Sequence, residues 1–348
     1  MDFKNKLKRW YSINKRNLPW RVTTDPYRIW LSEIILQQTQ VKQGLPYYKS
    51  FVKTYPTVFD LANANEEDVL KLWQGLGYYS RARNLHATAK YVASELNGKF
   101  PDNYKDLLQL KGVGDYTASA IASFAFNKAT AVVDGNVYRV LSRVFGIETP
   151  INSSAGIKEF KAIAQSLIDT KDPATYNQAI MEFGSVQCKP KTPDCPSCPF
   201  NTICIALQKG QQHLLPVKIN KTKVKTKYFN YLVFRDAKGQ TLFEKRTQKG
   251  IWKNLYQFPL VETEKSLNIS DFEQLDLEPY LKDILPFDIT LYNAIDKIHK
   301  LSHQHLHTKF WIIDTPELPK KAVSIKTIRK YPTSVLINDF INEFKFGL

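Results

Sequence analysis

The stretch Leu110-Lys-Gly-Val-Gly-Asp-Tyr-Thr-Ala118 decides the fold of this chain. It separates two segments, 104–110 and 116–126, in which apolar residues recur at helical spacing. Gly112 and Gly114 permit a tight turn whose backbone NH groups point outward at the start of the second helix, where the macrodipole favours an anion. This geometry predicts a phosphate site, although a Gly-x-Gly turn between helices is by itself weak evidence.

Helical spacing continues on both sides of this turn and defines a mainly α first region, which we place at 1–208. Its other predicted helices are 27–41, 66–73, 82–96 and 136–145. Residues 209–227 are rich in lysine and poor in apolar residues, which indicates a basic linker. The region 228–348 is predicted to be an α+β domain. Its predicted strands are 228–234, 241–244, 285–292 and 309–314, and its predicted helices are 271–284 and 334–344.

Length and charge limit what the chain can be. Its 348 residues favour two domains. The net charge is +16, and the basic excess is shared by the parts before and after Gln208. This suits either two domains that face one polyanion or a solvated basic surface. No stretch approaches the roughly 20 apolar residues that span a bilayer, and residues 1–10 are charged. We therefore expect a soluble cytoplasmic protein, nucleoid-associated if bacterial, with no membrane partner.

All four cysteines lie in one short stretch. They are Cys188, Cys195, Cys198 and Cys204. In a reducing compartment such a group favours metal over disulfides, and four thiolates suit either a 4Fe-4S cluster or structural zinc. Zinc sites generally use two close Cys pairs, whereas this stretch has one, so the spacing favours the 4Fe-4S cluster. Because nothing nearby resembles a redox partner, we expect the cluster to stabilise the fold.

Two acidic residues are candidates for chemistry. Glu33 lies on the otherwise apolar helix 27–41, and a glutamate buried there has a raised pKa and keeps a proton near neutral pH. The alternative is a solvated Glu33 on the helix surface. Asp134 follows an apolar run and precedes a helix, where an aspartate is most often no more than an N-cap.

The order of these motifs carries a family resemblance. A helix-hairpin-helix, then Val133-Asp-Gly-Asn-Val-Tyr-Arg-Val140, then a four-cysteine loop resembles the endonuclease III and MutY superfamily of DNA glycosylases. Lyase members of that superfamily place a Schiff-base lysine directly after the hairpin, where this chain has Tyr116. Without an amine there is no imine route to strand cleavage, so glycosylase-only activity is implied. The stretch from Trp30 to Gln40 also resembles the MutY branch.

The resemblance implies excision of adenine mispaired with 8-oxoguanine or guanine in double-stranded DNA, by a monomer that acts in base excision repair. Glu33 would protonate N7 of the flipped adenine, and Asp134 would stabilise the resulting oxocarbenium ion. Tyr116 and Asn136 would position Asp134. Arg21 and Leu76 would contact the adenine. Gln38 and Tyr78 would fill the gap that it leaves in the base stack. Gly112 and Gly114 would contact a phosphate.

Residues 231–259 resemble the opening of a MutT-like (Nudix-like) domain. The acidic helix that holds Mg²⁺ in Nudix hydrolases does not follow Pro259, so diphosphate hydrolysis is not expected. In MutY proteins this domain recognises 8-oxoguanine, and the matching loop is Leu301, Ser302 and His303, with Leu301 in place of an aromatic residue. Four histidines between 299 and 307 also suggest a metal, but they alternate as in a strand and have no acidic neighbours in the sequence.

Three rival interpretations exist. A glycosylase with lyase activity on oxidised pyrimidines is opposed by Tyr116 and by the second domain. A passive DNA-binding or damage-sensing protein would give Glu33 and Asp134 only structural roles. A Nudix hydrolase fused to a DNA-binding module is opposed by the missing acidic helix.

Overall fold

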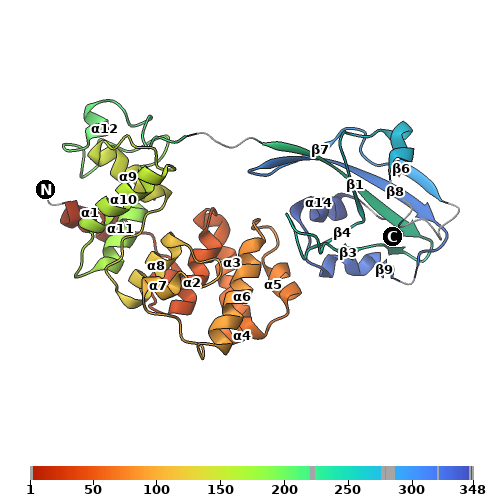
Figure 1. Cartoon of the computed structure of the whole chain (residues 1–348), viewed down its shortest axis with the longest axis horizontal. Helices are drawn as coiled ribbons and strands as arrows, with labels where there is room; N and C mark the ends of the chain where they lie inside the picture. The colour runs from red at the N-terminus through yellow and green to blue at the C-terminus, as the bar shows by residue number, and fades with distance from the viewer. Residues whose placement is uncertain are drawn as a thin grey trace. The chain divides into compact units, whose positions relative to one another are not determined.

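The computed structural model describes residues 3–219, 224–275, 279, 287–319, 321–344 and 346. The chain divides into two compact units, of which the first contains residues 1–63 and 84–220 and the second residues 64–83 and 221–348 (Figure 1). The second unit therefore includes a segment of the helical region as well as the C-terminal region. Within the linker range 209–227, residues 220–223 lie outside the described residues.

Helices build the first unit. They are α1 (Phe3–Asn14), α2 (Pro26–Leu36), α3 (Val41–Thr54), α4 (Val58–Asn63), α7 (Tyr104–Leu107), α8 (Asp115–Phe126), α9 (Gly135–Phe145), α10 (Ser154–Leu167), α11 (Pro173–Val186) and α12 (Ile205–Gln208), with the 3-10 turn η1 (Pro19–Arg21). In Figure 1, α1 lies beside α9, α10 and α11, so the beginning of the chain packs against its last long helices. The buried core between them includes Phe3 and Phe200, whose ring centroids lie 4.7 Å apart.

The predicted helix 27–41 is too long. Asp25 caps α2 by accepting a hydrogen bond from the Tyr27 backbone NH, but the helix stops at Leu36. Gln38 has a φ of 54°, a left-handed conformation through which a right-handed helix does not continue. The predicted helices at 82–96, 104–110, 116–126 and 136–145 are confirmed as α6 (Ser80–Ser94) to α9, with ends that shift by up to three residues.

The second unit contains α5 (Glu66–Leu72), the predicted helix 66–73, and a five-stranded sheet. The strands are β5 (Leu260–Thr263), β1 (Lys225–Asp236), β8 (Gln304–Thr315) and β6 (Asp288–Leu291) in spatial order, with β7 (Lys297–Lys300) also paired to β8. The central strands β1 and β8 are parallel, and the other pairs are antiparallel. Two small ladders join β2 (Gln240–Thr241) to β9 (Val323–Ser324) and β3 (Glu244–Lys245) to β4 (Tyr256–Gln257).

Alternation along β8 divides its buried side chains between the two faces of the sheet. Trp311 and Ile313 enter one hydrophobic core. Phe310 points to the other face, where its ring stacks on Phe340 of α14 (Val335–Glu343) with centroids 4.0 Å apart. The sheet is therefore covered on this face by the helix that the sequence predicted at 334–344, which is confirmed.

One prediction for this unit is wrong in detail, and another lies largely outside the described residues. The strand expected at 241–244 is interrupted, since β2 and β3 pair with different partners. The helix expected at 271–284 begins as the 3-10 helix η2 (Ile269–Gln274), whose capping box at Asn268 starts only a short turn before Leu275 becomes extended. Residues 276–278 and 280–286 lie outside the described residues. A second 3-10 helix, η3 (Ile325–Lys330), precedes α14.

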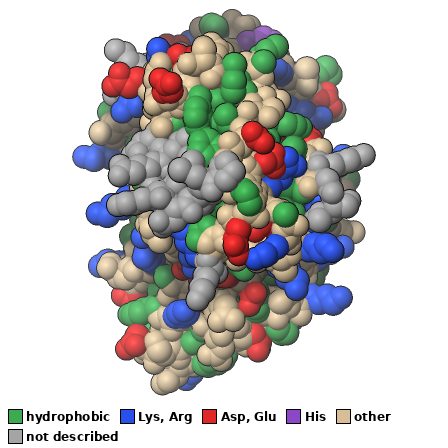
Figure 2. All heavy atoms as spheres, turned by 90° about the vertical axis from the view of Figure 1, so that its right-hand side faces the viewer, with side chains coloured by type: hydrophobic (Ala, Val, Ile, Leu, Met, Phe, Trp, Pro, Cys, Tyr) green, Lys and Arg blue, Asp and Glu red, His purple; other side chains and the backbone are tan. Residues whose placement is uncertain are grey.

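The surface seen in Figure 2 has Lys and Arg side chains along its margins and hydrophobic side chains mainly in its upper part. Within the described part of the chain, none of the helices combines the length and apolar character needed to cross a bilayer. The expected fold class, a mainly α region followed by an α+β domain, is confirmed by the element order.

Candidate active site

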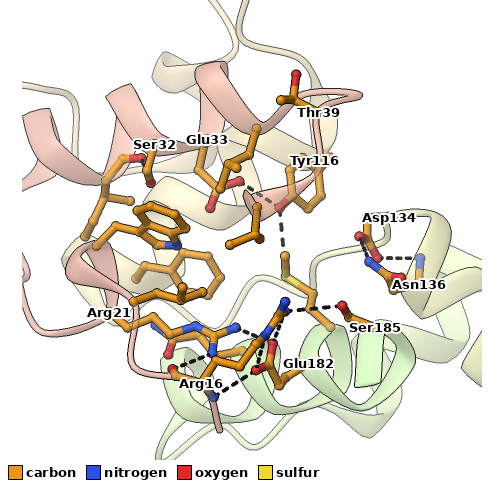
Figure 3. A pocket seen from close by; sticks show the side chains of 18 residues that line it. Arg16, Arg21, Ser32, Glu33, Thr39, Tyr116, Asp134, Asn136, Glu182 and Ser185 are labelled. Carbon is orange, nitrogen blue, oxygen red and sulfur yellow. Dashed lines mark hydrogen bonds and ion pairs between the residues drawn. The ribbon is translucent and has the colours of Figure 1, made fainter. Parts of the chain in front are cut away.

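A cavity in the first unit brings the two acidic candidates together. It has about 790 Å³ of empty space, including its opening to solvent, and both Glu33 and Asp134 line it. Its walls come from η1, α2, α8, α11 and the beginning of α9. Figure 3 shows Tyr116 between Glu33 and Asp134, with the arginines Arg16 and Arg21 on the opposite wall.

Glu33 is buried on α2, with 6% of the residue exposed. The solvated alternative for this residue is therefore wrong. Burial raises the pKa of Glu33 to about 7, although a hydrogen bond from Tyr116 opposes the shift. A carboxyl group with that pKa is protonated in a large fraction of molecules at neutral pH, which suits a general acid.

Tyr116 was expected to position Asp134, but its hydroxyl group donates to Glu33 Oε2 at 2.7 Å. The residue lies in the first turn of α8, which packs against α2, so the phenol points toward Glu33. Burial, with the nearby charges of Glu33 and Asp134, raises the pKa of Tyr116 well above its ordinary value. Tyr116 therefore stays protonated and acts as a donor to one oxygen of Glu33.

Asp134 is the N-cap of α9, and it also lines the cavity. Its Oδ1 accepts from the backbone NH groups of Asn136 and Val137 at 2.9 and 2.8 Å, and its Oδ2 accepts from Asn136 Nδ2 at 2.7 Å. Burial raises the pKa of Asp134, while these three donors stabilise its ionised form. Asn136 positions Asp134, as expected.

Gly184 of α11 allows this close arrangement. A Cβ atom at Gly184 would lie 2.7 Å from Asn136 Cβ and 2.8 Å from the Asn136 carbonyl oxygen. Any larger residue would therefore push the beginning of α9 away from α11, and Asp134 with it.

A third acid of this cavity, Glu182 of α11, is buried, and it was not among the predicted site residues. Its oxygens accept hydrogen bonds from the Arg16 backbone NH and guanidinium at 2.6 to 2.9 Å, and from Arg21 Nη2 at 2.7 Å. Burial alone would raise the pKa of Glu182, but these bonds lower it to about 2. Its signal in the sequence is an acid within the apolar run Ala179-Ile-Met-Glu-Phe183, the same pattern that singled out Glu33.

The predicted hairpin lies between α7 and α8. Gly112 has a φ of 82°, and a Cβ atom there would lie 2.8 Å from Asn84 Cβ, so this position suits glycine. Gly114 is the N-cap of the twelve-residue helix α8. Both glycines therefore occupy the turn for which a phosphate contact was predicted.

Two family models match this chain. The model of the HhH-GPD superfamily base excision DNA repair protein matches residues 31–165, and that of the NUDIX domain matches residues 230–343. The adenine DNA glycosylase of Buchnera aphidicola subsp. Schizaphis graminum is 34% identical over 307 residues, which cover 88% of this chain and 85% of that protein. The chain belongs to the adenine DNA glycosylase family.

Other comparisons agree with this family. The human adenine DNA glycosylase is 45% identical over 222 residues, which cover 61% of this chain and 41% of the human protein. A thermostable thymine-DNA glycosylase has a TM-score of 0.56 at 30% identity, with 60% of this chain and 95% of that chain covered. An endonuclease III–DNA complex, at 23% identity, shares the fold with a TM-score of 0.52, covering 61% of this chain and all of that chain. The family resemblance and the enzyme class, a DNA glycosylase that hydrolyses N-glycosyl bonds in base excision repair, are confirmed.

The four cysteines of the glycosylase line a second cavity in the first unit, with about 370 Å³ of empty space. Arg143 Nη1 lies 3.4 Å from Cys188 Sγ, and the Phe200 backbone NH lies 3.4 Å from Cys198 Sγ. Among the described residues, no three His, Cys, Asp or Glu side chains are arranged to hold a single metal ion. The four thiols border one space, with NH groups directed at two of the sulfur atoms, and four thiols are the donor set through which proteins bind an iron-sulfur cluster.

Arg139 of α9 links this cysteine loop to the catalytic candidates. It donates to the carbonyl oxygens of Cys188 at 2.8 Å and Gly184 at 2.6 Å, and to Asn136 Oδ1 at 2.8 Å. Asn136 in turn donates to Asp134. The cysteine loop therefore helps to orient Asp134 through Arg139 and Asn136.

The two residues predicted to line the adenine pocket, Arg21 and Leu76, belong to different units of the glycosylase. Arg21 lines the cavity and is held there by Glu182. Leu76 belongs to the second unit, and its contact with adenine stays a prediction. It is buried within the second unit, where Gly75 and Gly77 at φ of 100° and 73° set the course of the backbone.

The two residues predicted to contact the base stack, Gln38 and Tyr78, both have left-handed backbone conformations. Gln38 and Tyr78 have φ of 54° and 48°, and both side chains are exposed. In the second unit, Ser302 and His303 are exposed in the turn between β7 and β8, and Leu301 is half-buried. Ser302 Oγ lies 2.6 Å from Tyr78 Oη, so the structure brings these two predicted contacts together.

The expectation that the histidine-rich stretch has no acidic neighbour is wrong. Asp296 Oδ2 lies 3.0 Å from His307 Nδ1, and Asp296 Oδ1 accepts from Ser266 at 2.6 Å and lies 3.3 Å from Lys309 Nζ. These groups join the loop before β7 to β8. They form a polar cluster that braces the hairpin carrying Ser302.

Proposed function

We propose that the glycosylase excises adenine opposite 8-oxoguanine or guanine in double-stranded DNA and leaves an abasic site. One observation carries the proposal, namely that Glu33, with a pKa of about 7, and Asp134, supplied with three N–H donors, line the same cavity. A proton donor and a carboxylate on one cavity suit cleavage of a glycosidic bond through an oxocarbenium-like state. The names of the relatives support adenine as the base.

The reaction then follows from the positions of these groups. Glu33 donates its proton to N7 of a flipped adenine, and the bond to C1′ breaks with its electron pair on the purine. Ionised Asp134 stabilises the positive charge that develops on the sugar. Water adds to C1′ and returns a proton to Glu33, which restores the acid. Because Tyr116 occupies Oε2, Oε1 of Glu33 is the oxygen that carries the transferred proton.

The same proposal excludes strand cleavage. Tyr116 stands directly after the hairpin, where lyase members of the superfamily carry an amine. A phenol whose pKa is raised by burial does not form an imine with the sugar. The product is therefore an intact strand with an abasic site.

We propose that the second unit recognises the base opposite the adenine. Ser302 and His303 are exposed polar side chains on the β7–β8 turn, and both can hydrogen-bond the N7 and O8 edge that distinguishes 8-oxoguanine from guanine. The enzyme would act as a monomer on the duplex.

We also propose that Cys188, Cys195, Cys198 and Cys204 hold a 4Fe-4S cluster. When bound, the cluster would cross-link the loop of residues 188–204 and so fix the carbonyl group of Cys188 that accepts from Arg139. Its contribution is structural. A brown protein with broad visible absorption is expected, whereas a colourless protein with stoichiometric zinc would contradict the assignment.

One experiment tests the reaction. The protein is incubated with duplexes that contain adenine opposite 8-oxoguanine, adenine opposite guanine, thymine glycol opposite adenine, or no lesion, and strand breaks are measured with and without alkali. Breaks from the first two duplexes are expected only after alkali. Breaks before alkali would favour a lyase, and no base release from any duplex would favour a passive binder.

Asp134→Asn is the matched variant for that experiment. It removes the negative charge with little change of shape, so we expect DNA binding to persist and adenine release to be lost. Retained turnover would remove Asp134 from the mechanism.

A further inference from the structure

The segment Ala64–Arg83 packs with the C-terminal residues in the second unit, although its sequence neighbours belong to the first. At its beginning, Glu67 Oε1 accepts hydrogen bonds from Lys245 Nζ and from Tyr256 Oη, both at 2.9 Å. At its end, Arg83 Nη1 donates to the Lys253 carbonyl oxygen at 2.8 Å. The segment, which contains α5 and the beginning of α6 in orange in Figure 1, is thus fastened at both ends.

Three side chains fasten its middle to α14 and to the residues just before that helix. Lys71 Nζ donates to the carbonyl oxygens of Arg329 and Tyr331 at 2.7 and 3.1 Å. Gln74 accepts from the Thr333 backbone NH at 3.2 Å and donates to Asn338 Oδ1 at 2.9 Å. Tyr79 Oη donates to the Thr333 carbonyl oxygen at 3.0 Å. All three residues belong to the second unit, whereas the residues given as lining the cavity, Glu33 and Asp134 among them, belong to the first.

Tyr78 lies directly between two of these anchors. Its side chain is 46% exposed, although its φ of 48° is a strained value for an aromatic residue. The Arg81 guanidinium lies 5.6 Å from the Tyr78 ring centroid, and Ser302 Oγ lies 2.6 Å from its hydroxyl oxygen. The Tyr78 ring is therefore held in place by Arg81 and Ser302 although it is exposed.

Helix α6 continues from this segment into the first unit. Its residues Ser80 to Arg83 belong to the second unit, and residues from Asn84 onward belong to the first. There Thr88 Oγ1 donates to the Lys111 carbonyl oxygen at 2.8 Å, and Asn84 lies against Gly112. The part of α6 that belongs to the first unit therefore packs on the hairpin.

We propose that Lys71, Gln74 and Tyr79 are positioning residues that hold Tyr78 against the Ser302 turn, and that they set the preference for the base opposite the adenine. This inference rests on the proposed function, in which the second unit reads that base. When one of these three residues is lost, Tyr78 shifts relative to Ser302, and the two side chains no longer contact 8-oxoguanine together. We expect chemistry at Glu33 and Asp134 to be unaffected, because both acids are held by residues of the first unit.

Tyr79→Phe is the sharpest test, since it removes one hydroxyl group and keeps the ring. Single-turnover adenine release is measured in the full-length protein for adenine opposite 8-oxoguanine and for adenine opposite guanine. We expect the rate ratio between the two duplexes to fall about five- to tenfold, the effect of one lost hydrogen bond, through the 8-oxoguanine rate alone. Lys71→Met is expected to act in the same direction, and Lys71→Arg to restore most of the ratio.

Tyr91→Phe is the matched control. Tyr91 lies on the same helix α6 and is 47% exposed, within the part of the helix that belongs to the first unit. Its removal is expected to leave the ratio unchanged. An unchanged ratio in both Tyr79→Phe and Lys71→Met, or an equal loss on both duplexes, would overturn the inference.

A second readout separates this inference from the proposed function. A fluorescent purine analogue is placed beside the base opposite the adenine, and its quenching on protein binding reports stacking by Tyr78. Weaker quenching by Tyr79→Phe than by Tyr91→Phe is expected, and equal quenching would overturn the positioning role. If the unmodified protein shows no preference between the two duplexes, the proposed opposite-base recognition fails, while the quenching comparison still decides whether the anchors place Tyr78.

Discussion

Two walls of one cavity hold buried glutamates that differ by about five units in pKa. Glu33 on α2 has a pKa of about 7, and Glu182 on α11 has a pKa of about 2. Burial raises the pKa of both, but Glu33 receives a phenol hydrogen bond, whereas Glu182 receives two guanidinium groups. The comparison shows that the partner decides the role: an acid that keeps its proton is available for chemistry, and an acid that has lost it is an anchor.

The largest expected effect comes from Glu33→Gln. This change keeps the shape and removes the transferable proton, so adenine release should fall by about 10²- to 10⁴-fold. Single-turnover kinetics measure the loss, and a DNA-binding assay should show little change. A variant that keeps more than about a tenth of the rate would mean that Glu33 is not the general acid.

Glu182→Gln should act on stability instead. It leaves Arg16 and Arg21 as cations without their shared carboxylate, which costs about 3–5 kcal/mol in the free energy of unfolding. Denaturant titration measures this cost, and the exposed Glu159 on α10 provides the control Glu159→Gln, with an expected change within about 0.5 kcal/mol. Equal stability of the two variants would contradict an anchoring role.

The two acids should also differ in their dependence on pH. Glu182 has a lowered pKa, so the stability it contributes is present above its ordinary value of 4.5 and is lost as the pH falls toward about 2. Glu33 has a raised pKa, so its protonated fraction, and with it the rate of adenine release, should decline about tenfold per pH unit above about 7. A flat rate between pH 6 and pH 9 would exclude proton donation by Glu33.

Tyr116→Phe gives the smallest effect and sharpens the comparison. The hydrogen bond from Tyr116 lowers the pKa of Glu33, so its loss should raise that pKa further. The declining limb of the pH–rate profile should therefore move to higher pH. A shift to lower pH would show that Tyr116 stabilises the protonated form of Glu33 instead.

Local pattern was enough to predict much of the catalytic unit. The hairpin at Gly112, the cap at Asp134 and the burial of Glu33 each depend on residues within one or two helical turns, and each is present in the structure. The four-cysteine group was also visible in spacing alone, and its members line one cavity.

Contacts between distant parts of the chain were not predictable in this way. The pairing of Glu182 with Arg16 joins residues 166 positions apart, and the sequence around either residue does not indicate its partner. The direction of the Tyr116 hydroxyl group depends on how α8 packs against α2. The membership of Ala64–Arg83 in the second unit depends on anchors in the last twentieth of the chain, among them Thr333 and Asn338.

The double use of Asp134, as N-cap and as a wall of the cavity, has a consequence for damaged alleles. Asparagine caps a helix about as well as aspartate does, so selection for a folded protein does not distinguish the two residues at this position. An asparagine allele would accumulate to normal levels in the cell and pass any screen for expression. Under the proposed function such a protein would still bind its substrate without releasing the base, so only an assay of base release would reveal the defect.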